Sequence, residues 1–74
     1  MPLHLFVPQR FDGASATMRL ISAEGKTVRT IFDGTIQAGE STIRCDIGDL
    51  IPGPYLVVLH ALDKDAVYRL MVGE

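Results

Sequence analysis

The stretch Leu50-Ile51-Pro52-Gly53-Pro54-Tyr55 decides the fold of this 74-residue chain. Read as Leu-x-Pro-Gly-x-Tyr, it indicates a tyrosine corner, in which a tyrosine at the start of a strand donates a hydrogen bond to backbone a few residues upstream. The two prolines restrict the backbone, and Gly53 permits a positive φ or a close approach. The Tyr55 hydroxyl then satisfies a carbonyl that a crossing between sheets would leave unpaired. The motif predicts a β-sandwich and carries no information about a substrate.

The two strands expected after this motif are apolar on both faces. The first runs from Tyr55 to Leu62, and the second runs from Ala66 to Val72 with Arg69 as its charged exception. A tight turn at Asp63-Lys64-Asp65 is expected between them. Strands of this kind are central in a sheet or covered on both sides.

The strands expected before the motif alternate between apolar and polar residues, as half-buried strands do. A bulge near Ile31 is expected to bring Val28 and Ile31 to the same side of their strand. Pro8 removes a backbone donor and confines the first strand to an edge or an end. The expected strands are Leu3 to Val7, Ser15 to Ser22, Lys26 to Phe32 and Ser41 to Ile47, with Leu3, Leu5, Val7, Met18, Leu20, Ile43, Cys45 and Ile47 on their apolar sides.

Turn residues separate these strands. Glu24-Gly25 is typical of a hairpin turn. Phe11-Asp12-Gly13 is expected to form a turn, and Asp33-Gly34 and Ala38-Gly39 are expected to bracket a loop. Six short strands joined by hairpin-sized loops predict an all-β protein. The fold class is a small antiparallel immunoglobulin-like β-sandwich of six to seven strands, with residues 1–74 as a single domain.

Composition limits the class of function. The hydrophobic fraction of 47% and the charged fraction of 22% indicate a folded chain, because disordered chains are less apolar. The net charge of -2, with scattered Lys and Arg, argues against nucleic acid as a partner. No stretch is long enough to span a bilayer, and the first eight residues lack the basic lead and the full apolar run of a signal peptide. Cys45 is the only cysteine, which excludes an internal disulfide.

Four short pieces, taken in their order and spacing, carry a resemblance to a known family. They are Ala23-Glu24-Gly25-Lys26-Thr27-Val28, Ala38-Gly39-Glu40 with Ile43, Leu50-x-x-Gly53-x-Tyr55, and the apolar last strand Tyr68-Arg69-Leu70-Met71-Val72. Together they cover nearly the whole chain. The chain resembles the type A C-terminal sorting domains of cargo secreted by the type IX secretion system of Bacteroidota, which are similar to the immunoglobulin-like domain of flagellar hook-capping proteins.

This resemblance implies a function and a location. Domains of that family are appended to a cargo and pass the outer membrane, and they are commonly cut off as the cargo is anchored or released. The implied function is a non-enzymatic secretion and sorting module, located outside the cell or at its surface. The implied recognition element is the last strand, with residues Tyr68, Arg69, Leu70, Met71 and Val72, and the implied structural motif consists of Gly25, Gly39, Leu50, Gly53 and Tyr55.

Catalytic and metal sites have little support in the residues. Asp46 and Asp49, with Asp33 or Glu40 from a neighbouring loop, are a conceivable calcium site, but Asp residues at turns ordinarily bind nearby backbone. His4 and His60 are a conceivable pair across strands, yet no Ser or Cys lies in a nucleophile turn. Cys45 is expected to pack as a small hydrophobic residue. We therefore expect no catalytic residue, no metal and no cofactor.

The last two expected strands carry more apolar residues than a single core needs, and two interpretations of this surplus remain open. In the first, the strands are central, and the opposite sheet or the Leu3 to Val7 arm covers the second face. In the second, an exposed patch or strand edge meets a protein partner or a second copy of the chain. This favours an alternative function, a structural or adhesive immunoglobulin-like module that forms a homodimer. The surplus residues are Leu56, Val58, Leu62, Val67 and Met71.

Overall fold

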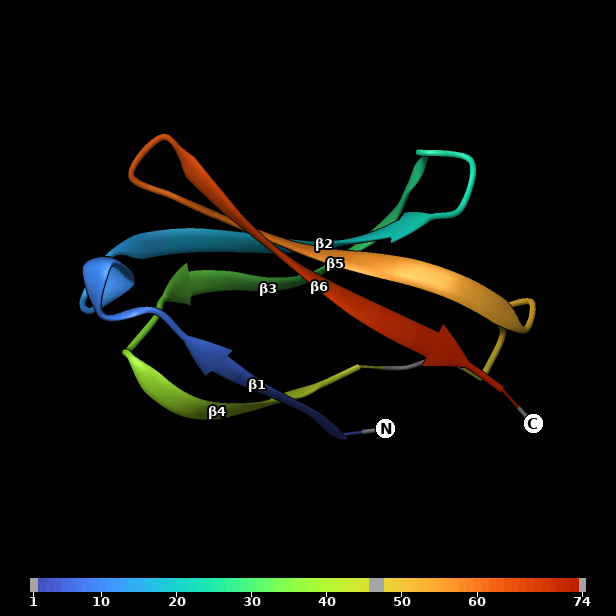
Figure 1. The fold of residues 1–74 in the computed structure, drawn as a ribbon, viewed down its shortest axis with the longest axis horizontal. Coiled ribbons are helices and arrows are strands. Elements are labelled where there is room, and N and C mark those ends of the chain that lie inside the picture. Colours follow the sequence, from blue (N-terminus) through green and yellow to red (C-terminus); the bar gives the residue numbers. More distant parts are fainter. Residues whose placement is uncertain (1, 46–47, 74) are drawn as a thin grey trace.

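The computed structural model describes residues 2–45 and 48–73, which form six antiparallel strands and one short 3-10 helix. The strands pack as two facing sheets, one with the order β1-β4 and one with the order β3-β2-β5-β6 (Figure 1). The all-β sandwich predicted from the sequence is confirmed. The elements are β1 (Pro2–Val7), η1 (Gln9–Phe11), β2 (Ser15–Ser22), β3 (Thr27–Thr35), β4 (Gly39–Arg44), β5 (Gly53–Ala61) and β6 (Lys64–Val72).

The strand order is that of an immunoglobulin-like sandwich. In that fold the strands B and E are neighbours in one sheet, and C′, C, F and G follow one another in the other. The strands β1 and β4 occupy the places of B and E, and β3, β2, β5 and β6 occupy the places of C′, C, F and G. The tyrosine of the sequence motif thus lies at the start of the strand equivalent to F, where a tyrosine corner belongs.

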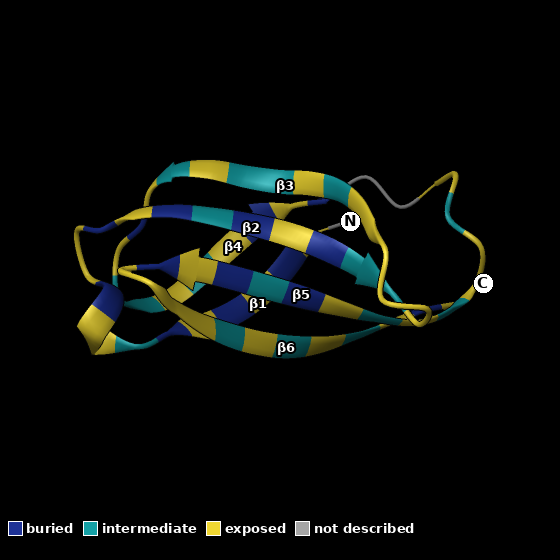
Figure 2. Ribbon diagram, turned by 90° about the horizontal axis from the view of Figure 1, so that it is seen from above, coloured by how far each residue is buried: buried dark blue, intermediate teal, exposed yellow. Residues whose placement is uncertain are grey.

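The core lies between the two sheets and uses one face of each strand. Buried and exposed residues alternate along β1, as the sequence predicts, and also along β2 and β5 (Figure 2). Cys45, just after β4, is buried, which confirms its expected inward position. The most fully buried large side chains are Phe11, Met18, Leu20, Leu59, Val7 and Val57.

The tyrosine corner is confirmed. The hydroxyl of Tyr55 donates a hydrogen bond of 2.6 Å to the carbonyl oxygen of Ile51, four residues upstream. Gly53 opens β5 with a φ of 151°, a conformation that a residue with a side chain rarely adopts. Leu50 is half-buried against the core. The corner thereby fixes the point at which the chain enters β5.

The turn between β2 and β3 also follows the sequence. Gly25 has a φ of 88°, and its N–H donates to the carbonyl of Ser22 at 2.9 Å. The register of β3 against β2 shifts at Ile31, which confirms the expected bulge, and it shifts again at Val28. Ile31 packs against the core, whereas Val28 is 36% exposed, so the two residues do not share one environment.

One expected loop segment is placed differently, and one expected turn is confirmed. Asp33 and Gly34 belong to β3, where they pair with Thr17 and Ala16 of β2. The two bulges let β3 follow the full length of β2, because each adds a residue without ending the ladder. The turn at residues 11–13 is preceded by the helix η1, whose Phe11 is fully buried and closes one end of the core. Ile47 lies outside the described residues.

The expected turn at Asp63-Lys64-Asp65 is wrong. The loop consists of Leu62 and Asp63, with φ values of 54° and 59°, and Ala61 pairs with Lys64 across it. Lys64 and Asp65 already belong to β6. A two-residue loop with positive φ at both positions matches the twist of the strands, which is why the hairpin closes so early.

We expect Tyr55→Phe to lower the free energy of unfolding by about 1 kcal/mol, because the variant loses the bond to Ile51 and leaves its carbonyl without this donor. Urea denaturation followed by circular dichroism measures the change. The matched control is Ile51→Ala, which keeps the backbone carbonyl and removes a side chain that is 80% exposed. If Tyr55→Phe lost no more free energy of unfolding than Ile51→Ala, the Tyr55 hydroxyl would contribute nothing to the stability of the fold.

We expect the double variant Leu62→Asn, Asp63→Gly to raise the free energy of unfolding by about 1 kcal/mol, since Asn-Gly adopts positive φ at less cost than Leu-Asp. Thermal unfolding measures the gain. Leu62→Ala is the control, because it shortens the side chain and keeps a β-carbon at positive φ. A double variant no more stable than Leu62→Ala would contradict the prediction.

Candidate functional site

The outer face of the four-stranded sheet is the most apolar exposed surface in the described part of the chain. On β5 and β6 it carries Met71, which is 70% exposed, Val67 at 57% and Leu56 at 38%. The register brings these residues together, because Val58 lies opposite Val67 and Leu56 lies opposite Arg69. This face is the second face of the two strands for which the sequence left the covering open.

No described element covers this face. The sheet of β1 and β4 lies on the other side of the four-stranded sheet, as the views in Figures 1 and 2 show. The expectation that the opposite sheet or the Leu3 to Val7 arm covers the second face is therefore wrong. A sandwich has only one interior, and β5, although central in its sheet, turns its second face to solvent. The interpretation as an exposed patch agrees with the structure.

A shallow groove of about 560 Å³ marks one end of the face. It lies between the β2–β3 turn, with Ser22 and Gly25, and the ends of β5 and β6. Leu56, Arg69 and Met71 line it, so an apolar floor is combined with a single positive charge. A flat apolar strip with one charged group fits a protein segment better than a small polar ligand.

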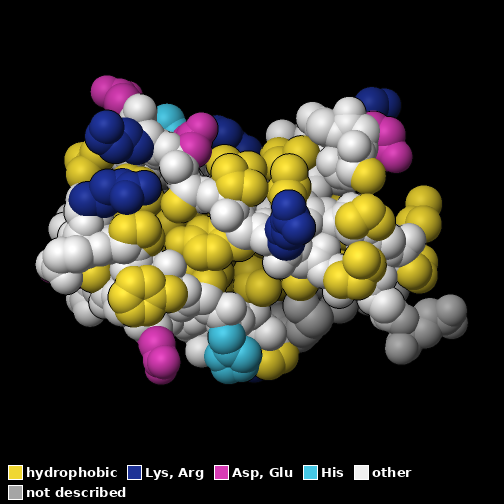
Figure 3. Space-filling view, in the orientation of Figure 1, with side chains coloured by type: hydrophobic (Ala, Val, Ile, Leu, Met, Phe, Trp, Pro, Cys, Tyr) yellow, Lys and Arg dark blue, Asp and Glu magenta, His cyan; other side chains and the backbone are white. Residues whose placement is uncertain are grey.

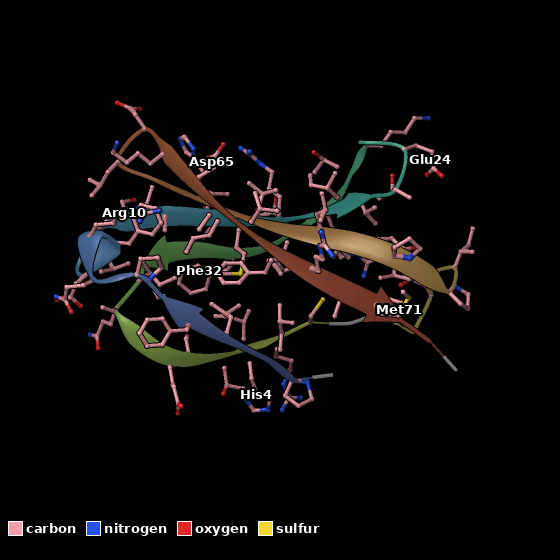
Figure 4. All side chains as sticks on the ribbon, viewed as in Figure 1. His4, Arg10, Glu24, Phe32, Asp65 and Met71 are labelled. Carbon is pink, nitrogen blue, oxygen red and sulfur yellow. The ribbon has the colours of Figure 1, made fainter. Side chains whose placement is uncertain are left out.

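The five expected recognition residues all belong to β6 and alternate in direction. Arg69 and Met71 are exposed on the outer face, whereas Tyr68 and Leu70 are half-buried toward the core and Val72 is buried. Figure 4 shows Met71 near the C-terminal end of β6 and Asp65 near the hairpin at its other end. The outer face therefore offers two of the five side chains, together with Val67 and Leu56 from the surplus apolar set.

No strand in the described part of the chain pairs with the outer edge of β6. The two-residue loop makes Ala61 and Lys64 a hydrogen-bonded pair, and antiparallel pairing alternates from there. Pro54, which has no N–H, then faces Met71 in a pair without hydrogen bonds, as the alternation requires. The backbone N–H and C=O groups of residues 65, 67, 69 and 71 accordingly point away from β5, toward the edge.

Tyr68 links this edge to the other sheet. Its hydroxyl donates a hydrogen bond of 2.8 Å to the carbonyl oxygen of Phe6 in β1. Partial burial raises the pKa of the Tyr68 hydroxyl above its ordinary value of 10.0, and the Arg10 charge opposes this weakly. No sequence pattern signals this bond, because it joins residues 62 positions apart in the chain.

The two histidines do not meet. His60 of β5 lies 2.6 Å from the carboxylate of Asp65 on the outer face of the four-stranded sheet, and both side chains are about half exposed. His4 contacts Thr42 at 3.0 Å on the outer side of the β1–β4 sheet and points away from the core (Figure 4). The sandwich thus separates them by its full thickness. Asp46, which the sequence analysis names for a calcium site, lies outside the described residues.

The carboxylates considered for calcium are also apart. Asp49 is held by Arg29 of β3, whose Nη2 lies 2.9 Å from both carboxylate oxygens. This bond lowers the pKa of the Asp49 carboxyl below its ordinary value, as does a backbone hydrogen bond. Asp33 lies in β3 and Glu40 in β4. Residues 2–45 and 48–73 contain no cluster of three or more His, Cys, Asp or Glu suited to a metal ion.

Two further findings complete the description of the site. Within the described residues the structure has no helix long and apolar enough to cross a membrane. Comparison of the chain with protein-family models, with curated proteins and with solved structures gives no match in any of the three. The functional argument therefore rests on the residues and on their geometry.

We expect the stability of the fold to fall at alkaline pH more steeply in the wild type than in Tyr68→Phe. The folded state raises the pKa of Tyr68, so it holds the proton after the unfolded chain, with its pKa near 10.0, has released it. The stabilisation is complete below pH 10 and is lost as the pH rises through the folded value. Urea denaturation between pH 8 and about pH 11 measures the slope. Equal slopes in both proteins would contradict the prediction.

Proposed function

We propose that the chain is a non-enzymatic sorting module that an outer-membrane export apparatus recognises through β6 and the loops beside it. One observation carries the proposal. The last strand lies at the edge of its sheet and presents Arg69 and Met71 on a face that no described element covers. A recognition strand has to be accessible while the domain is folded, and β6 meets that requirement.

The places of the family-like pieces support this proposal. Gly25 forms the β2–β3 turn, Gly39 opens β4, and the segment from Leu50 to Tyr55 forms the corner before β5. Each piece therefore lies at a turn, at a strand start or at the corner, and these positions are compatible with a structural role. If the chain is such a module, its place of action is outside the cell or at the cell surface.

The arrangement of the polar groups supports a role without catalysis. The contact between His60 and Asp65 lies half exposed on an open sheet face rather than in a cleft. An exposed pair of this kind lacks the low-dielectric surroundings that give catalytic groups their strength. The most apolar groove is lined by side chains suited to contact rather than to proton transfer.

A structural or adhesive immunoglobulin-like module is the second candidate function. The exposed side chains of Leu56, Val67 and Met71 favour it, because contiguous apolar residues on a small domain mark surfaces that meet other proteins. In this candidate the partner is a protein on the same surface or a second copy of the chain. Both candidates place the contact at β6.

A reporter fusion tests the sorting role. We expect residues 1–74, fused to the C-terminus of a reporter with its own signal peptide, to direct that reporter to the medium or the cell surface of a type IX-competent bacterium. Met71→Asp is expected to lower export about tenfold or more, because it replaces the most exposed apolar side chain of the recognised face with a charge. Reporter activity in cell fractions measures the result.

The matched control is Ile51→Asp, which makes the same change at a side chain that is 80% exposed and lies outside the face. Export by this variant should equal that of the unchanged fusion. Retention of the unchanged fusion inside the cell would refute the sorting role. Equal export by Met71→Asp and Ile51→Asp would refute the role of β6 in it.

A further inference from the structure

The edges of the two sheets differ in how they are protected against pairing. Natural proteins blunt exposed edges with bulges, prolines and charges. The edge strand β3 carries two register shifts. The edge strand β1 begins at Pro2 and ends just before Pro8. The backbone carbonyl of Phe6 in β1 already accepts a hydrogen bond from the Tyr68 hydroxyl.

The edge of β6 has few of these devices. It pairs with β5 over nine residues without a register shift, and it contains no proline. Its outward side chains are Asp65, Val67, Arg69 and Met71, the same residues whose backbone groups face the edge. The strand is therefore a regular, mostly apolar template with unused hydrogen-bonding groups.

The side of the sandwich below this edge is apolar as well. Figure 3 shows hydrophobic side chains gathered along the middle of the side where β6 and β1 lie. Ala66, Tyr68 and Leu70 are only partly buried against the core. A strand added beside β6 would cover these side chains. It would also form hydrogen bonds with the backbone N–H and C=O groups that face the edge.

The charged residues of β6 determine which partner strand can pair favourably with its edge. Two copies of β6 can pair antiparallel around a two-fold axis that passes between their Val67 residues. In that register, Asp65 of each chain lies directly opposite Arg69 of the other chain. Opposite charges directly across a ladder stabilise it, and like charges destabilise it. The symmetry makes the favourable pair occur twice.

Other two-fold registers lack this match. An axis at Arg69 sets two arginines directly against each other. An axis at Tyr68 sets Arg69 against Val67 and Asp65 against Met71, so that neither charge gains a partner. Arg69 forms no ion pair within the described residues, and Asp65 contacts His60 through one carboxylate oxygen, which leaves the other oxygen for a second contact.

We propose that β6 pairs with β6 of a second copy, antiparallel and centred on Val67, so that two chains form a homodimer with one continuous eight-stranded sheet. The inference rests on the second candidate function, the interaction module, and names its partner. Lys64 to Leu70 of each chain form the ladder. The outer faces of both copies then join into one apolar surface.

Charge exchange in solution tests the register. Sedimentation velocity of the full chain from about 1 to 300 µM is expected to show a monomer–dimer equilibrium. Asp65→Arg and Arg69→Asp should each raise the dissociation constant at least about tenfold, since each sets like charges together at two places. The double variant should return to within about threefold of the wild type, because it restores both pairs in reversed order.

Cross-linking tests the axis. Val67→Cys should form a disulfide-linked dimer on mild oxidation, because residues in a hydrogen-bonded pair have α-carbons about 5.5 Å apart. Met71→Cys, at a side chain that is more exposed than that of Val67, should not form it, because the two copies of residue 71 are eight residues apart along the ladder, about 27 Å. The oxidised wild type controls for Cys45.

Several results would overturn the inference: a wild type that stays monomeric at 300 µM, a double variant as weak as the single ones, or linkage at position 71 instead of 67. The outcome is separable from that of the sorting role. A monomeric chain whose export depends on Met71 would leave the sorting role intact and remove the homodimer. A dimer with the expected response to the charge variants, in a chain that is not exported, would support the homodimer and remove the sorting role.

Discussion

Apolar packing between a two-stranded and a four-stranded sheet is the constraint on which the rest of this structure depends. The inner faces of β1 and β4 meet the inner face of β3-β2-β5-β6, and the fully buried Met18, Leu20 and Leu59 lie at this junction. Because the smaller sheet is on one side only, the outer face of the larger sheet stays in water. The exposed apolar strip is a consequence of that asymmetry, and β6 is an edge strand because it comes last in the order β3-β2-β5-β6.

Much of the fold follows from period-two alternation, and the remainder depends on tertiary structure. Alternation places Leu3, Leu5 and Ile43 correctly because each strand has one polar face. It cannot place the second face of β5, since an apolar residue there fits a covered strand and an exposed patch equally well. Only the number of layers in the fold decides between them, because a two-layer sandwich has a single interior. The loop at Leu62 was missed for another reason, because Leu is not a residue that turn chemistry associates with positive φ.

The candidate site was predictable in its location and not in its geometry. The last strand was expected to carry recognition, and it is exposed at an edge, but alternation leaves only Arg69 and Met71 of its five residues on the outer face. The separation of His4 from His60 depends on which sheet each strand joins, and single-strand patterns do not contain that information. The proposed sorting role and the proposed self-association would use the same edge, so a chain paired with its copy could not present β6 to another protein at the same time.

Amide hydrogen exchange along β6 tests most directly the claim that its edge is open. In dilute solution, the account predicts fast exchange for the N–H groups of Val67, Arg69 and Met71, which face the edge, and slow exchange for those of Ala66, Tyr68 and Leu70, which face β5. Slow exchange of all six groups in dilute monomer would contradict it, because it would mean that the edge is already paired or covered within one chain.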